Sequence, residues 1–132
     1  MRTMIAATLV AVLSVGAVAG SLNTAHAATM SVIERGRYLV GPAGQCSDCH
    51  GVNLQGGPIG LLAPTLPPIV QRNAPKIAGL PMFHDESASV HFLETGELPG
   101  NRQARPPMPH YRFNHDDAVA IVAYLKSLAE RP

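Results

Sequence analysis

The sequence predicts a small all-α protein of one domain. Three segments carry helix start signals, stop signals or an apolar stripe at helical spacing, near residues 32–40, 86–95 and 115–129. Long stretches between them are rich in proline and glycine, as loops are. No alternating or β-branched strand runs flank the chain's two cysteines. A length of 132 residues leaves room for one domain.

The first helix is expected at about residues 32–40. Ser31 is a suitable N-cap, and Glu34 stands three residues later, which is the spacing of a capping box. Gly36 is costly inside a helix, so we interpret it as a point where another backbone or a ring comes very close. A merely tolerated glycine is the alternative. The Gly-Pro pair at residues 41–42 is expected to end this helix.

Two later helices have clear bounds. Asp85 is a plausible cap and Gly96 a plausible stop for a helix from about Glu86 to Thr95. The last helix is expected from about His115 to Ala129, with Asn114 as its cap and the strongest apolar stripe of the chain.

The remaining stretches predict little regular structure. Residues 51–68 and 97–111 are expected to be loops. A short helix within residues 69–77 is only weakly signalled, and Pro75 interrupts it.

The stretch Cys46-Ser47-Asp48-Cys49-His50 is the most informative motif. It is a C-x-x-C-H, the attachment pattern for c-type haem. Each thiol can form a thioether to a haem vinyl group, and His50 is placed to ligate the iron from one face. Because Cys46 and Cys49 are the only cysteines, the chain carries at most one such haem.

Three other interpretations of the cysteine pair are weaker. A thioredoxin-like redox motif needs a βαβ context, which the flanking sequence does not indicate. A four-ligand zinc site needs a second ligand pair at metal-site spacing, and no clear pair is present. A structural disulfide would not need His50 beside it.

Met108 and Pro64 are further candidate site residues. Prolines on both sides of Met108 exclude helix propagation, and a thioether is a soft ligand suited to haem iron. Packing is the alternative role for Met108. A metal-bound histidine usually donates its other ring N–H to a carbonyl or carboxylate, and a proline loop around Pro64 can present that carbonyl. Pro64 can equally be a turn residue.

The N-terminus predicts a secretory signal peptide over residues 1–27, with residues 28–132 as the mature domain. Arg2 supplies the positive start, residues 5–19 form an uncharged apolar run, and Ala25-His26-Ala27 is an A-x-A cleavage pattern. An uncleaved anchor is the alternative, but the apolar run is shorter than the ~20 residues of a usual spanning helix. We therefore expect no membrane span in the mature chain. The formal net charge of +1 and the balanced composition indicate no nucleic-acid partner.

Over about residues 31–129 the chain resembles class I cytochrome c. It is particularly similar to small bacterial cytochromes and to the cytochrome modules that accompany periplasmic dehydrogenases. The order of haem motif, proline loop, Met-Pro and terminal helix is much more specific than C-x-x-C-H alone. The resemblance is carried by Arg35-Gly36-Arg37-Tyr38-Leu39-Val40, Cys46-Ser47-Asp48-Cys49-His50, Phe92-Leu93-Glu94-Thr95-Gly96, Met108-Pro109, Asp116-Asp117 and Ile121-Val122-Ala123-Tyr124-Leu125.

The resemblance implies a small all-α cytochrome c fold wrapped around one covalent haem c. It implies that the first and last helices cross, with Gly36 close to Tyr124. It also implies that the Pro64 carbonyl accepts the hydrogen bond from His50, and that Met108 is the second axial ligand. Because Lys76 and Lys126 are the only lysines, the lysine ring of the mitochondrial-type branch is absent and its docking mode is not carried over.

Other side chains compete with Met108 as iron ligands. Met82 is the rival sulfur ligand. Its distance along the sequence from His50 is short for the family, and it does not directly precede the last helix. We therefore interpret Met82 as packing near the haem. His110 is two residues from Met108, which makes a ligand exchange at high pH conceivable. The remaining histidines that can in principle ligate are His84, His91 and His115.

The function expected from these residues is single-electron transfer by a periplasmic monohaem cytochrome, which is not an enzyme. Its partners would be redox proteins, with a periplasmic dehydrogenase as donor and an oxidase or another cytochrome as acceptor. One alternative is a haem enzyme or gas-binding protein with an open sixth iron site. Another is a fixed electron-transfer subunit of a dehydrogenase complex.

Overall fold

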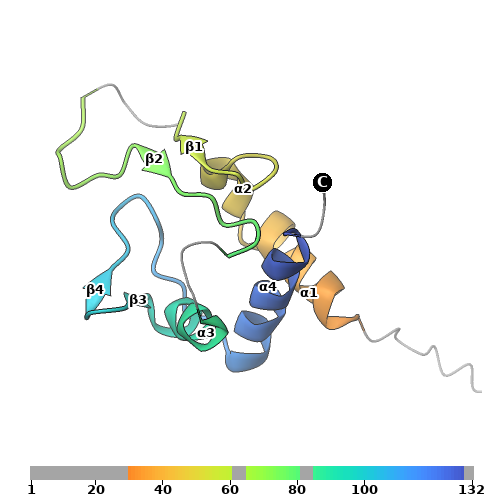
Figure 1. Cartoon of the computed structure of the whole chain (residues 1–132). Helices are drawn as coiled ribbons and strands as arrows, with labels where there is room; N and C mark the ends of the chain where they lie inside the picture. Colours follow the sequence, from red (N-terminus) through yellow and green to blue (C-terminus); the bar gives the residue numbers. More distant parts are fainter. Residues whose placement is uncertain (1–29, 61–64, 81–84, 130–132) are drawn as a thin grey trace, which may run out of the picture.

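The computed structural model describes residues 30–60, 65–80 and 85–129 (Figure 1). The expected signal peptide, Pro64, Met82 and His84 therefore lie outside the described residues. The elements in chain order are α1 (Val32–Tyr38), the π-helical η1 (Leu39–Ala43), α2 (Cys46–His50), β1 (Gly57–Pro58), β2 (Asn73–Ala74), α3 (Glu86–Thr95), β3 (Glu97–Leu98), β4 (Arg102–Gln103) and α4 (His115–Ser127). Since each described strand has only two residues, the predicted all-α class is confirmed.

Helix α1 begins as its sequence predicts. The Ser31 hydroxyl accepts a hydrogen bond from the Glu34 N–H at 3.2 Å, and the Glu34 carboxylate accepts one from the Ser31 N–H at 3.0 Å. The end of the helix differs from the expectation, because the chain continues past Tyr38 into η1. Pro42 lies inside η1, so the Gly-Pro pair does not end the helical path of the chain.

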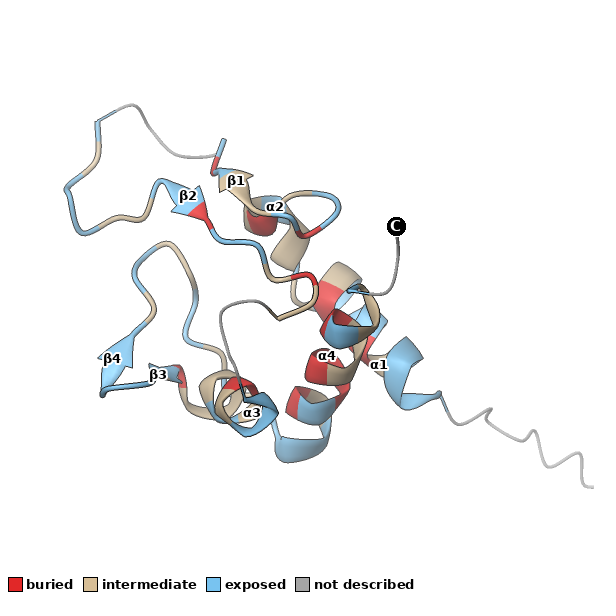
Figure 2. Cartoon of the chain, in the orientation of Figure 1, coloured by how far each residue is buried: buried red, intermediate tan, exposed pale blue. Residues whose placement is uncertain are grey.

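Helices α1 and α4 cross in direct contact at Gly36. This glycine is buried, and an added Cβ would lie 2.0 Å from the Ala120 carbonyl oxygen and 2.7 Å from the Tyr124 Cβ. The predicted close approach is therefore confirmed, and a merely tolerated glycine is excluded. Helix α4 has the largest set of buried residues among the described helices (Figure 2), and these are Ala118, Ala120, Ile121, Val122 and Leu125. The core cluster consists of Leu39, Val40, Leu54, Ala78, Ala120, Ile121 and Leu125.

A two-armed ion pair joins the same two helices. Arg35 Nε lies 2.8 Å from Asp117 Oδ1, and Arg35 Nη2 lies 3.1 Å from Asp117 Oδ2. The side chain of Asp117 is only 16% exposed, whereas that of Arg35 is 43% exposed. The hydrogen bond from Arg35 lowers the pKa of Asp117 below the ordinary aspartate value of 3.8.

We expect Asp117→Asn to reduce stability at neutral pH and to lose this effect in acid. Because the folded-state pKa of Asp117 lies below the unfolded value, the ion pair stabilises the fold above about pH 4. That contribution disappears as the pH falls through the folded-state pKa. Thermal melts at pH 7 and in acid should show a larger difference from the parent protein at pH 7 than in acid. Asp116→Asn makes the same charge change one residue away without removing the ion pair with Arg35, and should reduce stability at pH 7 less than Asp117→Asn does.

Helices α3 and α4 also begin and end at local signals. The Asp85 carboxylate accepts a hydrogen bond from the Ser87 N–H at 2.8 Å, and Gly96 ends α3 with a φ of 78°. Asn114 caps α4 by accepting from the Asp117 N–H at 2.9 Å. Helix α3 therefore has the predicted bounds, whereas α4 ends at Ser127, before the expected Ala129.

The prediction of a short helix within residues 69–77 is wrong. Residues 73–74 form β2, which pairs antiparallel with β1 through Gly57 opposite Ala74. After β2 the N–H groups of Ile77 and Ala78 both donate to the Leu54 carbonyl, at 2.9 and 3.1 Å. These long-range bonds, together with Pro75, replace the hydrogen bonds that a helix would have made. The predicted loop at 97–111 also contains a small hairpin, in which Glu97 pairs with Gln103.

Across the described ranges, no helix combines the length and the apolar character that crossing a membrane would require.

Candidate haem site

Helix α2 places the two cysteines and His50 together. It is a single turn between Gln45, which has a φ of 51°, and Gly51, which has a φ of 80°. Cys46 and Cys49 are three positions apart, so they lie on neighbouring parts of one helix face. Both are free thiols, and both line the same cavity as His50. The short helix therefore directs two sulfurs and one imidazole toward one space.

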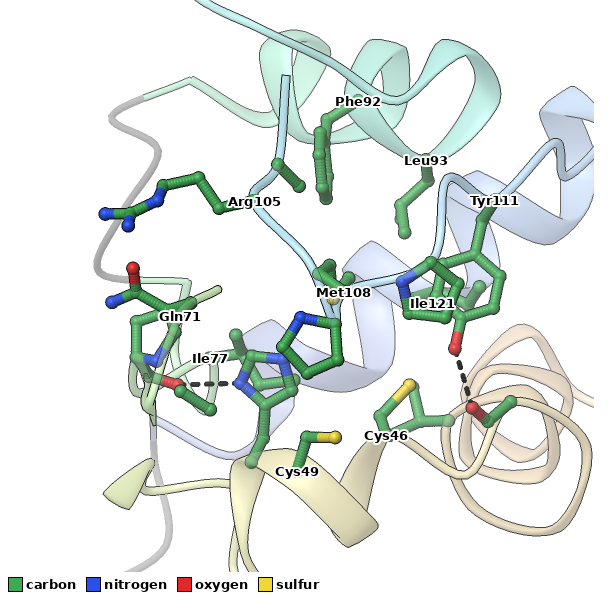
Figure 3. Close-up of a pocket in the computed structure, with 18 of the residues that line it drawn as sticks. Cys46, Cys49, Gln71, Ile77, Phe92, Leu93, Arg105, Met108, Tyr111 and Ile121 are labelled. Atoms are coloured by element: carbon green, nitrogen blue, oxygen red, sulfur yellow. Dashed lines mark hydrogen bonds between the residues drawn. The ribbon is translucent and has the colours of Figure 1, made fainter. Parts of the chain in front are cut away.

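That space is a cavity of about 1030 Å³ (Figure 3). This is at the upper end of the range for ligand pockets, which is roughly 300–1,000 Å³. One part of its wall is apolar and is built from α3, α4 and the chain before them. The apolar side chains there include Ile77, Leu80, Phe92, Leu93, Ile121 and Leu125.

His50 is held by a backbone carbonyl. It is 5% exposed, and its Nδ1 lies 2.7 Å from the carbonyl oxygen of Pro75. A carbonyl oxygen can only accept, so Nδ1 must carry the proton in this bond. In the neutral imidazole this leaves the lone pair on Nε2, which is the arrangement of a metal-ligating histidine.

The resemblance implied the Pro64 carbonyl as the partner of His50. Pro64 lies outside the described residues, and the structure gives this role to the Pro75 carbonyl. The physical reason is the β1–β2 pairing, which brings Ala74 opposite Gly57 and so carries Pro75 to α2. Gly56 permits this approach, since a Cβ there would lie 2.6 Å from the Ala74 oxygen. Gly56 also donates its N–H to the His50 carbonyl at 2.8 Å.

Met108 lines the cavity that Cys46, Cys49 and His50 line. Figure 3 shows it beside the space above the two cysteines. Its N–H donates to the Arg105 carbonyl at 3.2 Å, which closes a turn over residues 105–108. The proline-framed loop thus brings a thioether to the same space as the haem motif, far from it in sequence.

The rival histidines that the structure describes, His91, His110 and His115, lie outside the cavity lining. Among the described histidines, only His50 lines the cavity. His91 lies 3.5 Å from the Glu97 carboxylate, and His115 Nδ1 lies 2.8 Å from Glu94. The ring of His110 lies 3.2 Å from the Ala104 carbonyl oxygen.

Tyr111 is a cavity residue that the sequence did not identify. Its hydroxyl donates to the Gly44 carbonyl at 2.8 Å, and its ring stacks on Phe113 with centroids 5.0 Å apart. Burial is the main cause that raises the pKa of Tyr111, followed by the nearby cysteines. The bond fastens the turn that precedes Cys46. No sequence signal links Tyr111 to Gly44, because the contact spans 67 positions.

Burial also controls the state of Cys46. It raises the pKa of this thiol to about 11, so the sulfur is a protonated thiol at neutral pH. A protonated, largely buried thiol exchanges poorly with disulfides in solution. The S–H group can still add across a vinyl group, which gives a thioether without an oxidant.

The opposite edge of the cavity is polar and mainly basic. Its side chains come from the segments around β2 and β4, and the acidic side chain in the described lining is that of Asp48 on α2. Haem combines an apolar macrocycle with two carboxylates, and this combination of walls fits both parts. The polar residues that would hold the carboxylates are Gln71, Asn73, Lys76, Arg102 and Gln103.

A thiol pair, a histidine with a free Nε2 and a cavity of this character define a protein with one covalently attached haem. The family model for Cytochrome c matches residues 33–129, and the chain belongs to the cytochrome c family. The resemblance to class I cytochrome c, the all-α cytochrome c fold and the covalent haem c are confirmed, and Cys46 and Cys49 fit the attachment motif. No curated protein matches the chain.

Family membership also has a functional consequence. Cytochrome c proteins bind haem and generally carry electrons to and from redox proteins. The chain is thus a haem-binding electron carrier.

Proposed function

We propose that this protein carries single electrons between periplasmic redox proteins, with His50 and Met108 as the axial ligands of its haem iron and without enzymatic activity. The observation that carries the proposal is the convergence of four side chains on one cavity: Cys46, Cys49, His50 and Met108. When bound, haem supplies a one-electron couple between Fe(III) and Fe(II).

Each of these residues has a separate role. Cys46 and Cys49 anchor the macrocycle through thioethers. His50 offers Nε2 to the iron, and its bond to the Pro75 carbonyl keeps the imidazole in one tautomer and one orientation. Met108 offers sulfur from the proline-framed loop. With both axial positions filled, small molecules do not reach the iron easily, which favours electron transfer over substrate chemistry.

The surroundings raise the reduction potential. The apolar wall formed by residues such as Phe92, Leu93 and Ile121 disfavours the additional charge of Fe(III). Methionine as the second axial ligand acts in the same direction.

The partners we propose are a periplasmic dehydrogenase as donor and an oxidase or another cytochrome as acceptor. The N-terminal secretory pattern in residues 1–27 supports export. Val52, two residues after His50, is 91% exposed and offers an apolar contact beside the haem motif. A small contact of this kind suits a carrier that must release each partner quickly. Co-purification with a larger dehydrogenase would instead indicate a fixed subunit.

We expect Met108→Ala to retain covalent haem but to open the sixth iron site. Loss of the thioether should lower the reduction potential and let carbon monoxide bind to the reduced protein, which the parent protein should not do. Absorption spectra of the oxidised and reduced holoprotein, with and without carbon monoxide, would measure both the sulfur-to-iron band and ligand binding.

Met82→Ala is the matched control, since it removes the other methionine that the sequence offers as a rival ligand. It should leave the sulfur-to-iron band in place. If Met82→Ala opens the iron and Met108→Ala does not, the ligand assignment is wrong. If the parent protein is already high-spin and binds carbon monoxide readily, a haem enzyme or gas-binding protein becomes the better description.

A further inference from the structure

Two walls of the haem cavity are joined by hydrogen bonds at its polar edge. Arg105 Nε donates to the Ile69 carbonyl at 3.0 Å, and the Arg105 guanidinium also donates to the Pro68 carbonyl. The Gln71 N–H donates to the Pro106 carbonyl at 2.6 Å. We call the two bonds that Arg105 donates the clasp. Figure 3 shows Gln71 and Arg105 at one edge of the cavity, away from Cys46.

The clasp is directly connected to Met108. The carbonyl of Arg105 accepts the Met108 N–H at 3.2 Å, so the residue that forms two clasp bonds also closes the turn that carries the thioether. A displacement of Arg105 therefore displaces Met108.

The segment that carries Met108, residues 105–109, has few backbone donors to hold it in place. Three of its five residues, Pro106, Pro107 and Pro109, have no backbone N–H and so cannot donate a hydrogen bond. The side of the cavity that receives the clasp has the same character, because it includes Pro67 and Pro68. The described hydrogen bonds between the two segments are therefore few: the Gln71 N–H bond to the Pro106 carbonyl, and the two bonds that the Arg105 side chain donates.

We propose that Arg105 is a positioning residue whose clasp to the 68–69 backbone holds Met108 against the haem iron. This inference rests on the proposed role of Met108 as the distal ligand. Arg105 does not touch the iron itself. It acts by closing the gap between the two proline-rich segments, and when the clasp opens the Met108 sulfur leaves its position.

The size of the effect follows from exposure. Arg105 is exposed, and Ile69 is 63% exposed, so water competes for each of these bonds. The clasp is therefore weaker than a buried network. Its removal should favour an added ligand over Met108 by on the order of tenfold, which corresponds to the loss of about one or two ordinary hydrogen bonds.

The test is an imidazole titration of the oxidised holoprotein. Binding is monitored through the loss of the sulfur-to-iron absorption band. We expect Arg105→Ala to bind imidazole about tenfold more tightly than the parent protein. Arg105→Lys keeps one charged donor group and should lie between the two. Arg112→Ala is the matched control. Arg112 is an exposed arginine that follows Met108 in the chain and does not line the cavity. Its Nη1 donates to the adjacent Tyr111 carbonyl.

The outcomes separate this inference from the proposed function. If Arg105→Ala binds imidazole only as tightly as the parent protein does, the clasp does not hold Met108. The same conclusion follows if Arg112→Ala binds imidazole as tightly as Arg105→Ala does. If the parent protein lacks the sulfur-to-iron band, the assignment of Met108 itself fails. Should Arg105→Ala not mature, Arg105→Gln removes the charge and keeps an amide donor, and the same titration of that variant decides.

Discussion

Gly36→Ala should destabilise the holoprotein by about 3 kcal/mol or more, which is the upper range for overpacking a tight contact. The added Cβ would meet the Ala120 carbonyl oxygen at 2.0 Å and the Tyr124 Cβ at 2.7 Å. Both obstacles lie on the α4 backbone or next to it, so no side-chain rotation can relieve them. Helix α1 must move away from α4 to admit the methyl group.

The consequence would reach the haem cavity. Leu39 and Val40 follow α1 directly and pack in the same core cluster as Ile121 and Leu125 of α4. Val40, Ile121 and Leu125 also line the cavity. Separation of α1 from α4 would therefore disturb the apolar wall, and we expect a lower yield of haem-loaded protein as well as lower stability.

Gly41→Ala provides the control for this experiment. Gly41 lies in η1, five positions along the chain, and an added Cβ there meets nothing within 4 Å. Urea denaturation of both variants, with the parent protein alongside, would measure the difference. Equal stability of Gly36→Ala and Gly41→Ala would mean that the helix crossing is looser than its geometry indicates.

The second large effect should come from the cysteines. We expect the double variant Cys46→Ala/Cys49→Ala to lose all covalent haem, and each single variant to retain at most one thioether. The physical reason is that α2 presents no other nucleophilic sulfur, since these are the only cysteines in the chain. Haem staining after a denaturing gel measures covalent attachment directly, because haem held only by the iron ligands is removed.

Two further variants complete that experiment. Ser47→Ala changes a residue inside the motif and preserves both sulfurs and His50, so its staining should match that of the parent protein. His50→Ala should prevent stable maturation, because it removes the proximal ligand. Undiminished staining of the double cysteine variant would overturn the covalent attachment through these two residues.

Local chemistry allowed much of this fold to be predicted. The capping box of Ser31 and Glu34 forms within one turn, and Asp85 and Gly96 set both ends of α3. The haem motif is equally local, since one helical turn is enough to bring its sulfurs and imidazole to one face. Where a signal and its structural effect lie within four or five residues, the sequence carries the necessary information.

The exact bounds of some elements were less predictable. The Gly-Pro pair at residues 41–42 was expected to stop the first helix, but η1 continues through Pro42. Packing of Leu39 and Val40 in the core holds the chain in that turn. Likewise, the weak helical pattern at residues 69–77 does not form a helix, because β2 within it pairs with β1.

The sequence by itself determined the all-α fold class, the covalent attachment site and the need for a small residue at position 36. Only the tertiary structure decided that Pro75 rather than Pro64 holds His50, that Tyr111 fastens Gly44, and that Arg105 joins the two proline-rich segments. Each of these bonds ends on a backbone carbonyl. Every residue has such an oxygen, so no residue type marks the acceptor, and only the folded path of the chain brings one of them within reach.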